Sequence, residues 1–244
     1  YSPNSFTLTK GTQMTTVTPT ANGGTITGWS VSPSLPAGLS LDSSTGAISG
    51  TPTAVTSSAT YTITATNTGG NDTATVTIVV NDIAPSIAYS PSTLTLTKGT
   101  AMTNATVTST GGTVVSYAVS PSLPAGLSLD TSTGAISGTP TAITSSASYT
   151  ITATNTGGTD TASVTIVVND VAPSAVTYSP SSLTLINGTT MSTVEPTSGG
   201  GAVTNWSISP SLPAGLSFNN TTGAISGTPT AITSSGTYTV TATN

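Results

Sequence analysis

The chain has 244 residues, of which only 4% are charged, and its formal net charge is −5 with two basic residues. Two lysines cannot neutralise a phosphate backbone, so this composition excludes nucleic acid as a partner and gives no attraction to anionic membrane surfaces. The chain has no His and no Cys, which excludes Ser-His-Asp and Cys-His catalysis, thiol chemistry and the usual zinc sites.

Short alternations of apolar and polar residues follow one another from the first residues. The expected strands of the first segment are residues 5–9, 14–20, 25–32, 39–42, 46–50, 60–67 and 73–81. Apolar residues alternating with Thr indicate strands with one face on a core and the other in water. Seven such strands, separated by Gly, Pro and Asn turns, are typical of a Greek-key β-sandwich. No segment has helical periodicity, and no apolar run reaches the ~18 residues of a membrane span, so membrane insertion is not expected.

The pattern is repeated three times. PSLPAGLSLDSSTGAISGTP at 33–52 returns almost unchanged at 121–140 and 210–229, so that Leu35 recurs as Leu123 and Leu212, 88 and 89 residues further on. Each repeat has the size of one sandwich. The sequence therefore predicts three tandem immunoglobulin-like Greek-key β-sandwiches in an all-β chain, with boundaries at 1–82, 83–170 and 171–244.

The repeated motif has the composition of a hairpin. Pro36-Ala37-Gly38 has the residues of a tight turn, and Leu39 and Leu41 alternate toward a core. In the loop from Asp42 to Gly46, Asp can bond the loop amides and Gly can take the left-handed conformation. Asp42 is replaced by Asn219 in the third copy, which suits a turn and would destroy a catalytic acid. We therefore interpret the motif as structural.

A family resemblance is carried by these residues. LPAGLSLDSSTGAISGTP, followed by YTITATN and TVTIVVND, resembles the immunoglobulin-like tandem repeats of bacterial surface proteins, which are related to dystroglycan-type cadherin-like domains. The resemblance covers the whole chain and implies a bacterial extracellular or cell-surface location. Such repeats occur in stalks, adhesins and secreted multidomain enzymes alike, so the motif is specific for the fold and not for the function.

We expect a structural rod or stalk segment that spaces or presents other modules. One alternative is a subunit of an extracellular filament built by strand exchange, and another is an adhesin module that binds glycan or a host protein. The expected partners are neighbouring repeats of the same or another chain and, for the adhesin, a glycan or host-surface ligand. A glycosidase would need two carboxylates set about 5–10 Å apart. Each Asp of this chain, however, is explained by its position in a turn. We therefore predict no enzyme activity, no catalytic residue and no organic cofactor.

The placement of the acidic residues is compatible with one cofactor, calcium. NDIAPS at 81–86 and NDVAPS at 169–174 lie between repeats, and a further acid lies in the loop before each of them. Carboxylates from a linker and a neighbouring loop can bind Ca²⁺ through oxygens alone, and the likeness to cadherin-like domains favours such a site. The candidate ligands are Asp72, Asp82, Asp160 and Asp170. The alternative is that Asn81 and Asp82 only end the last strand.

Aromatic residues recur at equivalent positions. Trp29, Tyr117 and Trp206 occupy one of them. We expect these rings in the sandwich cores, as in many immunoglobulin-like folds, while exposure on one face would favour glycan binding.

The third repeat differs at its end. Asn244 corresponds to Asn67 and Asn155, so the segment equivalent to TATVTIVVND is absent. We expect a third sandwich that lacks its last strand and receives it from a continuing chain or, by β-augmentation, from another subunit. The remaining alternative is a naturally open sandwich.

Overall fold

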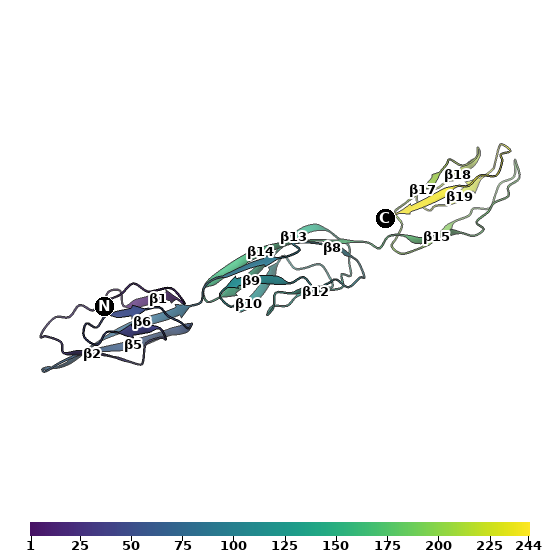
Figure 1. Cartoon of the computed structure of the whole chain (residues 1–244). Coiled ribbons are helices and arrows are strands. Elements are labelled where there is room, and N and C mark those ends of the chain that lie inside the picture. Colours follow the sequence, from purple (N-terminus) through teal and green to yellow (C-terminus); the bar gives the residue numbers. More distant parts are fainter. The chain divides into compact units, whose positions relative to one another are not determined.

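The computed structural model describes residues 1–244 and contains β-strands without a helix (Figure 1). It therefore has no helix of the length and hydrophobicity that crossing a membrane requires. By their contacts the residues form two compact units, one of Tyr1–Leu94, Ala101–Gly138 and Ala147–Ile166, the other of Thr95–Thr100, Thr139–Ser146 and Val167–Asn244. This division does not follow the sequence repeats, and the predicted boundaries stay predictions. Repeats 1, 2 and 3 denote residues 1–82, 83–170 and 171–244 below.

Repeat 1 contains β1 (Ser5–Thr9), β2 (Gly28–Ser32), β3 (Leu39–Leu41), β4 (Ile48–Gly50), β5 (Thr56–Asn67) and β6 (Gly70–Asn81). The main sheet has the order β1-β6-β5-β2, with β1 parallel to β6 and the other pairs antiparallel. A second layer is the β3–β4 hairpin, which an isolated bridge joins to Val17. Alternate residues of the sheet face this layer and form the buried core, which includes Tyr61, Ile63, Val76, Ile78 and Val80.

Repeat 2 repeats this arrangement. Its strands are β7 (Pro85–Tyr89), β8 (Thr93–Thr97), β9 (Val107–Gly111), β10 (Ser116–Ser120), β11 (Leu127–Leu129), β12 (Ile136–Gly138), β13 (Thr144–Asn155) and β14 (Gly158–Asn169). The order of its main sheet is β10-β13-β14-β8, and β11 pairs with β12. A further pair, β7 with β9, has no counterpart in repeat 1. The all-β fold of three immunoglobulin-like sandwiches is therefore confirmed.

Two expected strands of repeat 1 need correction. Residues 14–20 form no strand, because only Val17 makes a bridge, to Ile48. The strand expected over 60–67 begins at Thr56, where a register shift between Thr56 and Ala59 admits irregular pairing. In repeat 2, sequence reasoning missed β7, because a proline begins it and its alternation is only five residues long.

The repeated motif is the hairpin that its composition predicts. The Leu39 amide donates to the Pro36 carbonyl, and the Ser44 and Thr45 amides donate to Asp42 Oδ1 at 2.8 and 3.0 Å. Gly46 has a φ of +72°. In repeat 3, Asn219 Oδ1 accepts the equivalent two amide bonds at 2.8 and 3.1 Å, which confirms that this position serves the turn.

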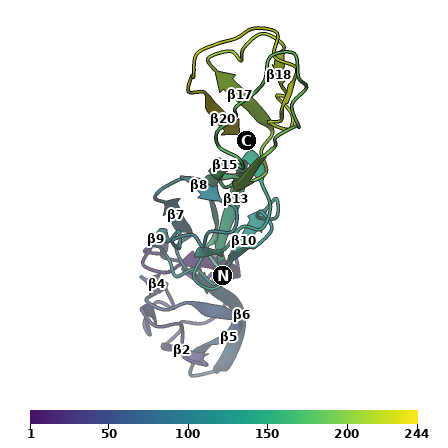
Figure 2. The ribbon, with the colours of Figure 1, turned by 90° about the vertical axis from the view of Figure 1, so that its right-hand side faces the viewer.

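Repeat 3 is less complete (Figure 2). It contains β15 (Ser174–Tyr178), β16 (Pro196–Gly199), β17 (Asn205–Ser209), β18 (Leu216–Phe218), β19 (Ile225–Gly227) and β20 (Thr239–Thr243), joined in three separate pairs. It has no counterpart of β6 and β14. Residues 182–186, which correspond to β1 and β8, form no strand, and Leu183 is 38% exposed where the equivalent Leu94 is 8% exposed. A strand that pairs only with the last strand does not form when that partner is absent.

Candidate functional site at the first junction

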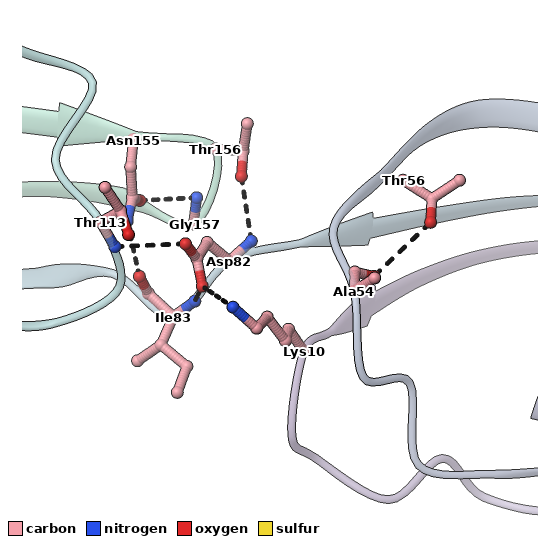
Figure 3. Close-up of polar contacts among 9 residues, drawn as sticks. All are labelled: Lys10, Ala54, Thr56, Asp82, Ile83, Thr113, Asn155, Thr156 and Gly157. Carbon is pink, nitrogen blue, oxygen red and sulfur yellow. Dashed lines mark hydrogen bonds and ion pairs between the residues drawn. The ribbon is translucent and has the colours of Figure 1, made fainter. Parts of the chain in front are cut away.

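Asp82 is the centre of the junction between repeats 1 and 2. It follows β6 directly and is 9% exposed. Its carboxylate accepts two backbone bonds, from the Ile83 amide to Oδ1 at 3.0 Å and from the Thr113 amide to Oδ2 at 3.2 Å (Figure 3). Its own amide donates to Thr156 Oγ1 at 2.9 Å. Asp82 therefore belongs by its bonds to the repeat that follows it.

Asn155, the last residue of β13, holds the next residue of the linker. Its Nδ2 donates to the Ile83 carbonyl at 2.7 Å. Its Oδ1 accepts the amides of Gly157 and Gly158 at 2.8 and 3.2 Å, which fixes the orientation of the side chain. Asn155 is 8% exposed, so both ends of its amide are used in a site from which water is largely excluded.

Two glycines let the linker backbone come this close. A Cβ on Gly112 would lie 2.2 Å from the Ile83 carbonyl oxygen, and a Cβ on Gly157 would lie 2.1 Å from the Asp82 carbonyl oxygen. Real Cβ atoms essentially never approach a backbone oxygen so closely. The linker therefore lies in a slot formed by the loop after β9 and the turn between β13 and β14, and only glycine fits on its two walls.

Lys10 reaches the same carboxylate from repeat 1. Its Nζ lies 3.8 Å from Asp82 Oδ1, and its side chain is 43% exposed. Because the Lys10 end of this ion pair is exposed and the two atoms are far apart, the pair contributes little to stability, within about 0–1 kcal/mol. The Lys10 amide also donates to the Asn81 carbonyl at 2.9 Å. Chemically, the arrangement can hold a polypeptide segment in place.

The second junction uses equivalent residues. The Val171 amide donates to Asp170 Oδ1 at 2.9 Å, and the Asn244 Nδ2 donates to the Val171 carbonyl at 2.6 Å. The Gly201 amide donates to that same carbonyl at 3.0 Å, and a Cβ on Gly201 would lie 2.0 Å from it. The asparagine and the glycine wall therefore recur, while Thr113 is replaced by Ala202.

Each of the four predicted calcium ligands accepts a hydrogen bond from a different backbone amide. Asp72 is exposed on β6, and its Oδ1 accepts the Thr73 amide at 2.8 Å. Asp160 Oδ2 accepts the Ile87 amide of β7 at 2.7 Å, while Asp82 and Asp170 bond linker amides. No group of three or more acidic side chains comes together. Calcium at these residues stays a prediction, which a calorimetric titration with CaCl₂ and a melting curve in EDTA would test.

The predicted core aromatics lie over the loop of the hairpin. Tyr117 and Trp206 are each 6% exposed, which confirms their place in the core, whereas Trp29 is only partly buried against it. The Tyr89 hydroxyl donates to the Gly134 carbonyl beneath the Tyr117 ring, as Tyr178 does to Gly223 in repeat 3. Burial, with a smaller effect from Tyr117, raises the pKa of Tyr89 to about 12.

Sequence reasoning missed the residues that hold the linker. Asn155, Thr156 and Gly157 begin the segment NTGG, which stands at 67–70 and 155–158, and a Gly-Gly pair stands at 23–24, 111–112 and 200–201. A turn needs one residue with positive φ, so the other glycine of each pair had no local explanation. That unexplained glycine was the signal for a close backbone approach.

Comparison with known proteins agrees with this architecture. The family model described as "Putative Ig domain" matches residues 1–81, 84–169 and 172–244. The chain belongs to this family of immunoglobulin-like domains. Over 176 residues it is 35% identical to a serine-rich adhesin for platelets from Staphylococcus aureus, and 34% identical to the same adhesin from strain MW2. Each match covers 68% of this chain and 7% of the adhesin, so the chain spans a small part of the length of these relatives.

Solved structures with similarity to this immunoglobulin-like chain include titin and Dscam1. A three-domain fragment from the I-band of titin is 15% identical with a TM-score of 0.42, covering 98% of this chain and 90% of the fragment. The N-terminal four immunoglobulin domains of Dscam1 isoform 9.44 are 14% identical with a TM-score of 0.44, covering 68% and 43%. Similarity at this level carries no information on function.

Proposed function

We propose that this immunoglobulin-like chain is a spacer segment of a bacterial cell-surface or secreted protein, where its repeats hold other modules at a distance. The supporting observation is the first junction, where the linker is bonded into repeat 2 through Asp82, Asn155 and Thr156. A flexible connection would leave these backbone groups to water and let the repeats move independently. A bonded connection transmits orientation and tension from one repeat to the next.

The surface location is part of the same proposal. It rests on the similarity to a staphylococcal adhesin, together with a composition whose polarity comes from Thr, Ser and Asn with few charges. The proposed role is mechanical and not enzymatic.

A distance measurement tests the spacer function. The chain has no Cys, so Ser44→Cys and Ser132→Cys, on exposed hairpin loops of repeats 1 and 2, would accept spin labels at two defined sites. We expect a narrow distance distribution by double electron–electron resonance. Removing the bonds with Asp82→Ala and Asn155→Ala should widen it at least twofold. Asp42→Asn, which keeps its loop as Asn219 does, is the matched control. A distribution equally wide in the parent and the double variant would contradict a stiff spacer.

An adhesin role is the second candidate, because the similar staphylococcal protein is by its name an adhesin for platelets. The partly buried Trp29 gives repeat 1 an accessible ring. A glycan array probed with the whole chain and with Trp29→Tyr tests this role. Specific glycan signals that Trp29→Tyr reduces would support the adhesin role. The absence of signals would contradict glycan binding, and the spacer function would stay the first candidate.

The third candidate is a filament subunit built by strand exchange. It is motivated by β20 of repeat 3, whose one pairing partner is β17. Electron microscopy of the purified chain over a range of concentrations tests it. Filaments that lengthen with concentration would favour this role, and monodisperse particles would contradict it.

A further inference from the structure

All methionines of the chain occupy one equivalent position of the repeat. They are Met14, Met102 and Met191, and each lies three residues after the glycine of a K-G-T or N-G-T motif. The chain has no Cys, so these three thioethers are its only sulfur atoms and the groups most open to two-electron oxidation. A position that all three repeats fill with the same oxidisable side chain is examined best through its place in the fold.

In repeat 1 the methionine lies in the loop that joins the two layers of the sandwich. Residues 10–17, here called the connecting loop, follow β1 of the main sheet directly. The Met14 amide donates to the Gly50 carbonyl, at the end of β4, at 3.0 Å. Three residues further on, Val17 forms its bridge with Ile48 of the same hairpin. Met14 therefore stands where the main sheet is connected to the second layer.

The Met14 side chain belongs to the core. It is 7% exposed and is a member of the buried apolar cluster that also contains Phe6, Ile48 and Ile78. Methionine is unbranched and flexible, and it fills irregular gaps between larger side chains. The side chain in this cluster and the backbone bond to Gly50 together fix the connecting loop over the core.

The other two methionines have the same backbone bond. The Met102 amide donates to the Gly138 carbonyl at 3.0 Å, and the Met191 amide donates to the Gly227 carbonyl at 3.0 Å. Their side chains differ in access to solvent, because Met102 is partly exposed where Met14 is buried. Repeats 1 and 2 therefore present one connection with two different degrees of protection.

We propose that these methionines are modification sites for peroxides, and that their oxidation weakens the connection between the two layers of a repeat. The thioether sulfur attacks one oxygen of the peroxide, so that a sulfur–oxygen bond forms as the oxygen–oxygen bond breaks. Sulfur loses two electrons and the peroxide gains them. With hydrogen peroxide, the proton of the transferred hydroxyl passes to the departing hydroxide, which leaves as water. The product is methionine sulfoxide, a polar side chain.

The sulfoxide does not suit the place of the thioether. A polar group buried without a hydrogen-bond partner is unfavourable, so the oxidised Met14 side chain leaves the apolar cluster. Because its backbone is bonded to Gly50, the side chain cannot leave without displacing the connecting loop. The rate of oxidation follows exposure, since a buried sulfur reacts only when the loop opens locally. The loss of stability follows burial, so it is larger for Met14 than for Met102.

Treatment of the whole chain with hydrogen peroxide tests the proposal, with peptide mapping by mass spectrometry to follow each methionine. We expect Met102 to gain its oxygen about threefold faster than Met14, or more, because Met14 reacts through local opening. The melting temperature of the fully oxidised chain should fall by about 5 °C or more. Hydrogen exchange should show that β3 and β4 lose protection in the oxidised chain.

Leucine variants are the matched controls. Leucine keeps the apolar volume of methionine and forms no sulfoxide. In the triple variant Met14→Leu, Met102→Leu, Met191→Leu, the same peroxide treatment should leave the melting temperature unchanged. Met14→Gln, which places a polar side chain of similar length in the cluster, should lower the melting temperature without peroxide. Methionine sulfoxide reductases reverse this modification, so they should restore the melting temperature of the oxidised parent chain.

Three results would overturn the proposal. The first is complete sulfoxide formation with an unchanged melting temperature. The second is an equal fall in the triple leucine variant, which would assign the damage to other side chains. The third is oxidation of Met14 at the rate of Met102, which would contradict the protection by the core. None of these outcomes bears on the spacer function, because the distance measurement is made without an oxidant.

Discussion

Repeat 3 should gain stability from a strand that follows Asn244. The perturbation is a fusion of TGGTDTASVTIVVND, the sequence of residues 156–170, to the end of the chain. In repeats 1 and 2 the inward residues of this segment, Val76, Ile78, Val80 and their equivalents, are 0% exposed. We expect the added strand to pair with β20 and with residues 182–186, which would then become a strand as β1 and β8 are.

The magnitude follows from the burial of three side chains. At about 1.5–3 kcal/mol for each fully buried Val or Ile, the added strand contributes roughly 5–8 kcal/mol. This is an upper estimate, because an unfolded chain already buries part of its apolar surface. It is nevertheless comparable to the total stability of a small domain, about 5–15 kcal/mol. Leu183, which is 38% exposed, should also approach the 8% exposure of Leu94.

Trp206 reports on this repeat alone when Trp29 is replaced by Tyr, the residue that repeat 2 has at that position. Its fluorescence during urea unfolding should show a higher midpoint in the fusion than in the parent chain. A fusion in which the three inward residues are Ser is the matched control, since it adds the same length without the apolar face. If Trp206 unfolds at the same urea concentration in all three proteins, the strand is dispensable and the argument from burial is wrong.

Three further predictions concern the slot of repeat 2 that holds the linker, the tyrosine above the hairpin loop, and the loop itself. Asp82→Ala should lower the free energy of unfolding of repeat 2 by about 1–3 kcal/mol, because it removes the acceptor of two part-buried hydrogen bonds from the Ile83 and Thr113 amides. Asp72→Ala at an exposed site should change it by no more than about 0.5 kcal/mol. Urea unfolding measures both effects, and equal effects would contradict the role of Asp82. The pKa of Tyr89 is about 12 in the folded chain and has the usual value of 10.0 when the chain is unfolded. The protonated hydroxyl therefore stabilises the fold fully below pH 10, and this stabilisation is lost as the pH rises through about 12. In Tyr89→Phe the melting temperature should fall less at alkaline pH, and a pH profile equal to that of the parent chain would refute this. Gly46→Ala should be more destabilising than Gly11→Ala. Both glycines have positive φ, +72° and +77°, but a Cβ on Gly46 would lie 2.6 Å from the Trp29 ring, whereas a Cβ on Gly11 would meet nothing within 4 Å. Equal melting temperatures of the two variants would refute the clash.

The sequence alone determined the fold and its repetition. Alternation of apolar residues with Thr indicates strands whichever partners they find, because side chains of a strand alternate between its faces. The hairpin loop was predictable in the same way, since Asp42, Asn219 and Gly46 act through bonds and dihedral angles of their own loop. These features depend on neighbours within a few residues, which is why one sequence without an alignment suffices for them.

Only the tertiary structure decided what depends on partners far along the chain. Asn155 and Ile83 are joined by one hydrogen bond across 72 positions, and no local pattern announces such a pair. The same tract is a strand in β8 and irregular at 182–186, because its pairing partner is present in one repeat and absent from the other. Strand formation and backbone approach are decided by what lies beside a segment in space, and that information resides in the assembled fold.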